Sequence, residues 1–116
     1  MNPAKRSELW LADLGEPKEG HEQAGQPPVV IFQTDELSRL DTVVVIPLTK
    51  QQKRAGFANT VFIPAQEAGQ DHPSVALCHQ IRVLDRRKLI HRIGRLPAER
   101  LSEIEVATVF VLGIPS

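Results

Sequence analysis

Short apolar segments alternate with polar stretches along the whole chain, and glycine or proline marks most of the boundaries between them. Runs of β-branched and aliphatic residues bounded in this way are typical of β-strands. The pattern predicts strands at residues 8–14, 29–34, 42–48, 60–63, 74–84 and 89–96. The segment 74–84 is expected to bend near Cys78 and His79, which gives five to seven short strands in all.

Two of these strands carry distinctive patterns. Residues 43–46 are four consecutive β-branched residues, the strongest strand signal in the chain. The first half of 29–34 is entirely apolar, so we expect it to be buried on both faces. The polar residues 50–54 and the turn-forming residues within 65–73 are expected to be loops.

Helical periodicity is strongest at the C-terminal end of the chain. Residues that can face a core recur there at helical spacing, at Leu101, Ile104, Thr108 and Val111. Pro97 suits the first position of this helix, because its missing N–H would have no partner there, and Gly113 ends the pattern. A single helical turn is expected at 35–40, with Asp35 as its cap.

Many short strands with one C-terminal helix predict a mainly β fold of the α+β class. Such strands commonly curl into a small closed or half-closed barrel, and a single helix can cover an open face. At 116 residues the chain has room for one hydrophobic core. We therefore expect a single domain over residues 1–116.

Composition narrows the function classes. The chain has 14 Lys and Arg residues together and 14 Asp and Glu residues together, so its net charge is zero. This balance is unlike that of a DNA-coating protein, but it is compatible with a local basic surface. The polar N-terminus, interrupted by Pro3, does not resemble a signal peptide, and no apolar run approaches the roughly 20 residues of a membrane helix. We therefore expect a soluble, cytoplasmic protein that contacts no membrane. Cys78 is the only cysteine, and its apolar surroundings predict a buried structural thiol.

No arrangement of side chains in the sequence predicts a metal or cofactor site. The histidines lie far apart, at positions 21, 72, 79 and 91, and no cysteine or acidic pair has ligand spacing. The chain also lacks a glycine-rich phosphate-binding loop and a serine elbow. We therefore expect neither a metal nor a cofactor.

The most constrained polar segment is the loop at residues 15–26. Gly20 and Gly25 permit backbone angles that a side chain disfavours, while Pro27 and Pro28 hold the exit extended. The loop therefore holds polar groups at the mouth of a strand, where functional residues often lie. A plain connector between two strands is the alternative interpretation.

This loop and its neighbours resemble a known family. Residues 8–14 followed by Gly20-His21-Glu22-Gln23-Ala24-Gly25-Gln26-Pro27-Pro28 are similar to the N-terminal signature of the MazF/PemK toxin endoribonucleases, a strand followed by G-x-E-Q-x-G-x-R-P and a buried strand. Further matching segments follow in order at residues 45–49, 80–85, 92–96 and 111–114. The resemblance covers nearly the whole chain and implies an SH3-like barrel with helical additions that forms a homodimer.

For function, the resemblance implies metal-free cleavage of single-stranded RNA, in which the ribose 2′-OH attacks the adjacent phosphate. Thr49 matches the family's active-site threonine, Glu22 a loop carboxylate implicated in activity, and Gln80 a glutamine along the RNA groove. Gln23, beside the glutamate, joins the expected RNA-binding residues. The family also implies a cognate antitoxin, whose acidic, flexible tail fills the same groove. Without the family pattern, each of these residues would be assigned a structural role.

The chain departs from the family where Pro27 stands in place of an arginine that binds phosphate and transfers protons. Proline has neither a charge nor a hydrogen-bond donor. We expect other residues to supply the missing charge or proton, namely His21 on the same loop, or Lys50, Lys53 or Arg54 in a later loop. His21 is the candidate for acid–base work, since histidine changes charge near neutral pH.

The segment 79–95 is rich in basic residues, which are Arg82, Arg86, Arg87, Lys88, Arg92 and Arg95 against a single Asp85. Such a concentration in a neutral chain suits a phosphate backbone, and Arg82 and Arg86 are the expected RNA contacts. The alternative is a set of solvated charges on alternate strand positions. Trp10 is expected in the core, whereas Phe57 fits either a core or a base-stacking role.

Three functions are compatible with these observations. The first is an endoribonuclease toxin that an antitoxin inhibits. The second is a relative that binds RNA or antitoxin but cleaves slowly or not at all, because Pro27 replaces the arginine. The third is a gyrase poison of the CcdB type, which shares the fold but whose signature the sequence does not resemble.

Overall fold

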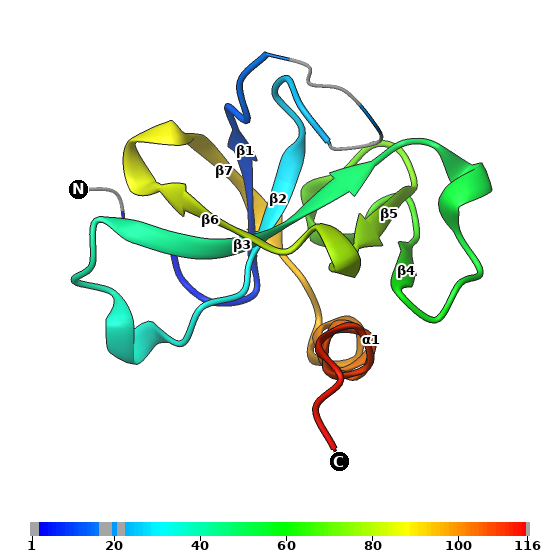
Figure 1. The fold of residues 1–116 in the computed structure, drawn as a ribbon. Coiled ribbons are helices and arrows are strands. Elements are labelled where there is room, and N and C mark those ends of the chain that lie inside the picture. The colour runs from blue at the N-terminus through cyan, green and yellow to red at the C-terminus, as the bar shows by residue number, and fades with distance from the viewer. Residues whose placement is uncertain (1–2, 17–19, 21–22, 116) are drawn as a thin grey trace.

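The computed structural model describes residues 3–16, 20 and 23–115. Within these residues the strands are β1 (Glu8–Ala12), β2 (Pro28–Ile31), β3 (Thr42–Thr49), β4 (Thr60–Ile63), β5 (Ser74–Leu77), β6 (Arg82–Asp85) and β7 (Leu89–Arg95). One α-helix, α1 (Ala98–Leu112), follows them (Figure 1). Short 3₁₀ turns connect the strands, and they are η1 (Asp35–Leu37), η2 (Gln52–Arg54), η3 (Glu67–Gly69), η4 (Cys78–Gln80) and η5 (Arg86–Lys88).

The element boundaries agree with the sequence prediction in most places. The strand predicted at 60–63 is β4, and the bend predicted near Cys78 is the turn η4, which separates β5 from β6. β2 ends at Ile31, earlier than predicted. Beyond it, the Gln33 side chain takes up hydrogen bonds that strand pairing would otherwise make. Its amide oxygen accepts the Val44 N–H at 3.3 Å, and its Nε2 donates to Leu37 and Thr42 carbonyls at 3.2 and 3.4 Å.

Two predicted cap positions are wrong. Thr34, not Asp35, caps η1, since its hydroxyl accepts the Glu36 N–H at 3.3 Å. The Asp35 carboxylate instead accepts the Arg6 N–H at 2.8 Å. Pro97 is the N-cap of α1 rather than its first helical residue, with an extended backbone. In both cases the prediction missed the position by one residue.

All strand pairs are antiparallel, and β3 is common to both parts of the sheet (Figure 1). The strand order is β4-β5-β3-β2-β1-β7, and β6 also pairs with the first half of β3. The fold is therefore mainly β and barrel-like with a C-terminal helix, which confirms the predicted class. In the part of the chain described, no ladder joins β4 to β7, so the sheet is not closed.

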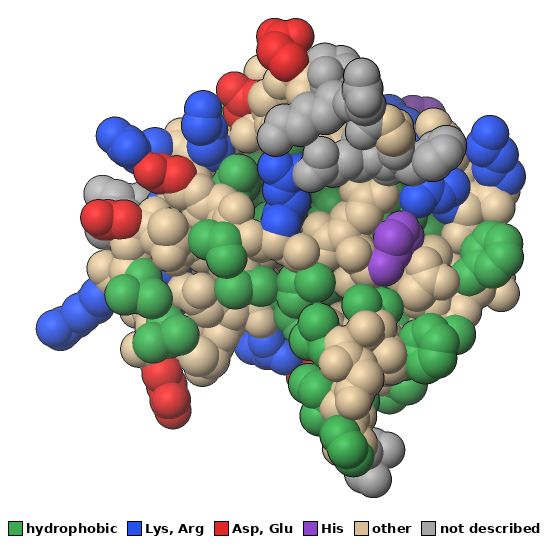
Figure 2. Space-filling model, in the orientation of Figure 1, with side chains coloured by type: hydrophobic (Ala, Val, Ile, Leu, Met, Phe, Trp, Pro, Cys, Tyr) green, Lys and Arg blue, Asp and Glu red, His purple; other side chains and the backbone are tan. Residues whose placement is uncertain are grey.

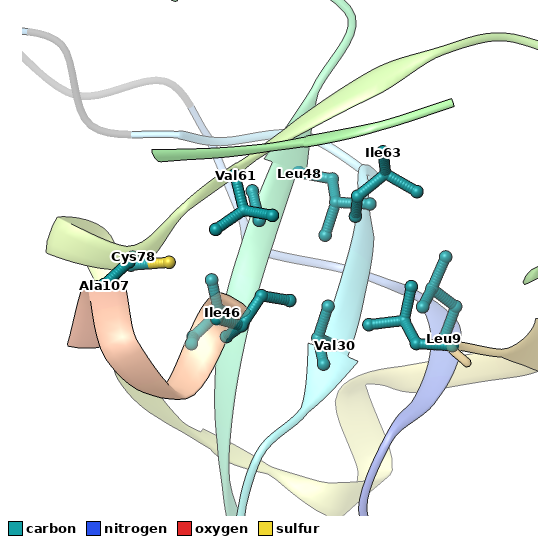
Figure 3. Close-up of a cluster of buried hydrophobic side chains, with 11 residues drawn as sticks. Leu9, Val30, Ile46, Leu48, Val61, Ile63, Cys78 and Ala107 are labelled. Carbon is teal, nitrogen blue, oxygen red and sulfur yellow. The ribbon is translucent and has the colours of Figure 1, made fainter. Parts of the chain in front are cut away.

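Both faces of the central strands are buried. Side chains of one face form a cluster with α1, and its members include Leu9, Val30, Ile46, Leu48, Val61, Ile63, Cys78 and Ala107 (Figure 3). The alternate side chains of the same strands form a second cluster, which includes Trp10, Ala12, Val29, Ile31, Val43 and Val45. These clusters confirm the two-sided burial predicted for the β2 segment and the core position predicted for Trp10. Burial raises the pKa of the Cys78 thiol to about 11, as suits a structural cysteine.

Apolar side chains also remain on the surface around α1 (Figure 2). The exposed side chains there include Val106 and Phe110 of the helix, Phe57 before β4 and Phe62 within β4. Phe57 is 60% exposed, so it is not a core residue. No helix among the described residues is long and apolar enough to span a bilayer.

A buried carboxylate joins β1 to β7. Burial alone would raise the pKa of Glu8, but hydrogen bonds from the Trp10 indole, the Lys5 N–H and Arg92 outweigh this effect and lower the pKa below its ordinary 4.5. The distances to these three donors are 3.1, 2.8 and 2.8 Å. Hydrogen bonds to a charged group of this kind contribute about 1.5–3 kcal/mol each.

Glu8→Gln is expected to lower the free energy of unfolding at pH 7 by about 1–3 kcal/mol, because the partners lose a charged acceptor. Since the folded-state pKa is depressed, this contribution is present above the unfolded-state pKa and is lost as pH falls through the folded-state value. Urea unfolding at pH 7 and pH 3 measures the effect. A difference between the two proteins that stays the same at both pH values would contradict the assignment to the carboxylate charge.

Candidate functional site

A groove of about 580 Å³ opens beside the C-terminal end of β3. Three segments line most of it, namely the loop before β2, the residues at the end of β3, and the turn before β5. Its polar lining residues are Gln23, Gln26, Thr49, Lys50, Gln51, Gln70, Asp71, His72 and Ser74. Its apolar lining residues are Leu11, Ala24, Pro27, Pro28, Leu48 and Ile93.

Gln23 ties the loop to the sheet. Its backbone N–H donates to Gln80 Oε1 at 2.6 Å, and its side-chain Nε2 donates to the Leu48 carbonyl at 3.0 Å. The Arg82 guanidinium donates to the Gln23 carbonyl at 3.3 Å. Gln80 and Arg82, predicted to contact RNA, are thus residues that position the loop at the groove.

Thr49 occupies the end of β3 and is 6% exposed. Its hydroxyl oxygen accepts the Gln51 N–H at 3.2 Å. A hydroxyl carries one donor as well as acceptor lone pairs, so its hydrogen stays available to a group in the groove. The exposed Lys50 follows directly and also lines the groove. Three residues predicted for the site, Gln23, Thr49 and Lys50, therefore share one hollow.

The other predicted site residues are distributed differently. Lys53 and Arg54 lie in η2 and do not line this groove. Arg54 instead lies 3.5 Å from His79 Nε2, and burial together with the nearby Arg54 charge lowers the pKa of His79. His21 and Glu22 lie outside the described residues. Pro27 is buried and lines the groove.

Arg86, which the sequence predicts to contact RNA, is occupied within the fold. Its side chain is buried, with the residue only 3% exposed. Its Nε donates to the Leu40 carbonyl at 2.7 Å, and a terminal nitrogen donates to the Ala4 carbonyl at 3.4 Å. The guanidinium thus fastens two distant backbone segments, a role that its neighbours in the sequence do not indicate.

The basic segment 79–95 is partly neutralised in the fold. Arg87 pairs with Asp85 at 2.8 Å. Arg92 and Arg95 both approach the Glu8 carboxylate, at 2.8 and 3.8 Å. The electropositive surface predicted from this segment is therefore smaller than its count of basic residues suggested.

The turn between η3 and β5, together with the first residue of β5, contributes groove residues that sequence reasoning missed, which are Gln70, Asp71, His72 and Ser74. The ladder between β3 and β5 pairs Thr49 with Val75 and so brings this turn to the groove. Gln52 Nε2 also donates to the Pro73 carbonyl at 3.1 Å. The sequence predicted a turn here, but only the pairing of distant strands determines which side of the sheet it faces.

Among the described residues, no three His, Cys, Asp or Glu side chains form a group that could hold a metal ion.

Comparison with known proteins identifies relatives of the whole fold. A family model described as "PemK-like, MazF-like toxin of type II toxin-antitoxin system" matches residues 5–111. An endoribonuclease from Mycobacterial species, solved with its cognate antitoxin, is 19% identical with a TM-score of 0.80, covering 97% of this chain and 98% of that chain. MazF from Deinococcus radiodurans is 24% identical with a TM-score of 0.79, covering 96% and 97%. The Mycobacterium tuberculosis toxin MazF-mt6 is 21% identical with a TM-score of 0.77, covering 94% and 99%. These structures share the fold described above.

Proposed function

Because the chain belongs to the PemK-like, MazF-like toxins of type II toxin–antitoxin systems, we propose that it is a metal-independent endoribonuclease that cleaves single-stranded RNA. The observation that carries the proposal is the shared groove, where Thr49, Lys50 and Gln23 meet from separate segments of the chain. We further propose that residues 1–116 act as one domain, since the family match extends over residues 5–111.

The reaction moves one proton off the RNA and one proton onto it. The ribose 2′-OH loses its proton as its oxygen bonds to phosphorus, and the bond from phosphorus to the 5′ oxygen breaks. That 5′ oxygen takes a proton, so the products are a cyclic phosphate and a free 5′-OH. Charge develops on the phosphorane oxygens, where donors and cations contribute most to the rate.

The groove residues fit these needs. The Thr49 hydroxyl donates to a phosphate oxygen, because its acceptor side is already used by the Gln51 N–H. The Lys50 ammonium offsets the charge of the phosphorane. Glu22, which the family resemblance implies, and His21, which the sequence offers as an acid–base group, complete the proposed set.

His72 is the residue that we assign to proton transfer in the described part of the groove. The titratable side chains among the described lining residues are Lys50, Asp71 and His72. As a residue type, histidine both takes and gives a proton near neutral pH. Its imidazole is exposed and makes no hydrogen bond to another described residue, so both ring nitrogens are available to substrate.

The partner follows from the same surface. The complex of the Mycobacterial endoribonuclease contains its cognate antitoxin. For this chain we propose a cognate antitoxin whose acidic, flexible segment occupies the groove and competes with RNA. The Lys50 ammonium, which would face a phosphate of RNA, can also pair with a carboxylate of this segment.

A homodimer is proposed from the apolar surface around α1 (Figure 2). Val106 and Phe110 are 72% and 63% exposed, and Phe57 and Phe62 lie in the neighbouring hollow between the helix and β4. Large apolar side chains grouped in this way on a small protein favour association. A second copy of the chain is the occupant that the family resemblance favours.

Thr49→Val tests the proposed cleavage. Purified natural protein is expected to cut single-stranded RNA in EDTA and to leave cyclic phosphate ends, whereas the valine variant, which lacks the donor, is expected to be slower by on the order of a hundredfold. Thr49→Ser keeps the hydroxyl and is the matched control. Gel analysis of a labelled RNA measures both rates.

A binding-only protein is the second candidate, favoured by the uncharged Pro27 in the groove lining. Binding of RNA or antitoxin without any cleavage would replace the first proposal with this one. DNA damage on expression, without loss of RNA, would favour the gyrase-poison alternative instead.

A further inference from the structure

A polar cluster brings together three side chains from separate segments, namely Arg54 of η2, Asn59 before β4 and His79 of η4. Asn59 Nδ2 lies 2.8 Å from His79 Nδ1. A terminal nitrogen of Arg54 lies 3.5 Å from His79 Nε2. His79 is exposed, whereas Arg54 and Asn59 are half-buried. We call these three residues the His79 cluster, and its imidazole is open to a ligand from solvent.

Hydrogen bonds hold the segments that carry this cluster. The Asn59 carbonyl accepts the Cys78 N–H at 3.1 Å, which ties the segment before β4 to η4. Gln52 Nε2 donates to the Lys50 and Pro73 carbonyls at 3.2 and 3.1 Å, which fixes η2 against the turn before β5. The cluster is thereby preorganised, so a ligand that binds there has few further groups to order.

The three side chains present more donors than acceptors. A guanidinium has five N–H donors and no acceptor, and the 3.5 Å contact is longer than an ordinary hydrogen bond. When Asn59 Nδ2 donates to Nδ1, the imidazole proton is on Nε2 and faces Arg54. With the Asn59 amide turned over, Nε2 accepts from Arg54 instead. In both arrangements the other Arg54 donors meet no acceptor among the described residues, and an anion would supply one.

The charge around the cluster is positive. Residues 50–66 include Lys50, Lys53 and Arg54 but no Asp or Glu. Five other arginines pair with a carboxylate, whereas no ion pair joins Arg54 or Lys53 to a described carboxylate. Burial and the Arg54 charge lower the pKa of His79. Among the described side chains visible in Figure 2, the right of the view carries Lys, Arg and His but no Asp or Glu. A phosphate would supply the missing negative charge.

Two segments connect the cluster to the groove. Lys50 and Gln51 line the groove, and η2 follows them directly. Arg54 is four residues beyond Lys50, and a chain of that length spans at most about 14 Å. On the other side, η4 carries Gln80, whose Oε1 accepts the Gln23 N–H of the groove at 2.6 Å. A strand of a few nucleotides that leaves the groove past Lys50 can therefore reach the cluster.

We propose that Arg54, Asn59 and His79 form a second phosphate-binding subsite, which holds a phosphate of single-stranded RNA where the strand leaves the groove. The inference rests on the proposed function, since it takes RNA as the ligand. Arg54 supplies the charge, His79 donates from Nε2 to a phosphate oxygen, and Asn59 fixes the imidazole. Because every nucleotide carries a phosphate, the subsite adds affinity for longer RNA without reading a base.

Oligonucleotides of two lengths test the subsite. Strands of 2′-O-methyl RNA lack the attacking hydroxyl, so fluorescence anisotropy measures affinity without cleavage. Arg54→Gln and His79→Ala are each expected to weaken binding of a dodecamer on the order of fivefold, the effect of one partly exposed charge contact. Binding of a trinucleotide, which fills only the groove, is expected to change little. Arg54→Gln is also expected to lower the slope of log affinity against log salt by about 0.7, the value for one phosphate contact on a single strand.

Arg39→Gln is the matched control, because Arg39 is an exposed arginine outside η2 and the groove. It removes the same charge elsewhere and is expected to keep both affinities and the salt slope of the natural protein. Thermal unfolding checks that all variants are folded. Equal dodecamer affinities for the natural protein and Arg54→Gln would overturn the inference. An equal loss in Arg39→Gln, or an equal loss for both lengths of RNA, would also overturn it.

Cleavage and a second ligand separate this inference from the proposed function. If the natural protein cleaves RNA and Arg54→Gln binds the dodecamer as tightly, the subsite is absent although the protein is a nuclease. If neither protein cleaves RNA but Arg54→Gln loses affinity for the dodecamer alone, the inference stands and the proposed nuclease function fails. If Arg54→Gln weakens binding of an acidic peptide and leaves dodecamer binding unchanged, the cluster serves a protein partner and the inference is overturned.

Discussion

Pro27→Arg is expected to increase RNA cleavage on the order of a hundredfold. The groove lining contains Pro27 in the position that the family pattern assigns to an arginine, and Thr49 and Lys50 line the same hollow. A guanidinium placed there would add up to five donors and a permanent positive charge where the phosphorane forms. One such donor is commonly worth about 2.7–4 kcal/mol of transition-state stabilisation.

Two controls separate this effect from a general gain of charge or flexibility. Gln26→Arg adds the same side chain at the adjacent exposed residue of the groove. Pro27→Met removes the proline ring without adding charge. Single-turnover cleavage of a labelled RNA measures all three variants, and circular dichroism checks their folding. Equal rates for the natural protein and Pro27→Arg would mean that this position does not act in the reaction.

Pro27 also has a structural role in the fold, which the arginine variant would lose. The Pro27 carbonyl accepts the Ala12 N–H at 3.1 Å, and β2 begins at the next residue. A proline here fixes the backbone as the chain enters the buried strand. The arginine variant is therefore expected to gain activity at the expense of some local rigidity.

The strands were predictable because local sequence determines them. The four β-branched residues at 43–46 strongly favour a strand. The apolar run at 29–31 indicated burial on both faces, and these residues are buried. The bend predicted near Cys78 and His79 is the turn η4. In each case the signal and the structure lie within a few residues of one another.

The groove was predictable only in part, because it depends on pairing between distant segments. Thr49 and Gln23 were identified through the family pattern, which carries long-range information that periodicity lacks. Gln70 and His72 reach the groove only because β5 pairs with β3. The structural role of Arg86 was not predictable for the same reason, since its partners, the Leu40 and Ala4 carbonyls, lie 46 and 82 residues away.

His72→Asn is expected to reduce RNA cleavage by about a hundredfold or more, which is the usual contribution of a positioned acid–base group. Asparagine keeps a polar side chain of similar reach but cannot take up a proton. His91→Asn is the matched control, because His91 is an exposed histidine of β7 that does not line the groove.

Chemical rescue distinguishes proton transfer from a structural role of the same residue. In His72→Ala, added imidazole is expected to restore part of the cleavage rate, since a free base can enter the space left on the exposed rim of the groove. Imidazole should leave Thr49→Val unchanged, because that variant lacks a donor rather than a base. If His72→Asn cleaves at the natural rate, or if both histidine variants lose activity equally, the proton must be handled by another group, and the loop residues His21 and Glu22 become the ones to replace.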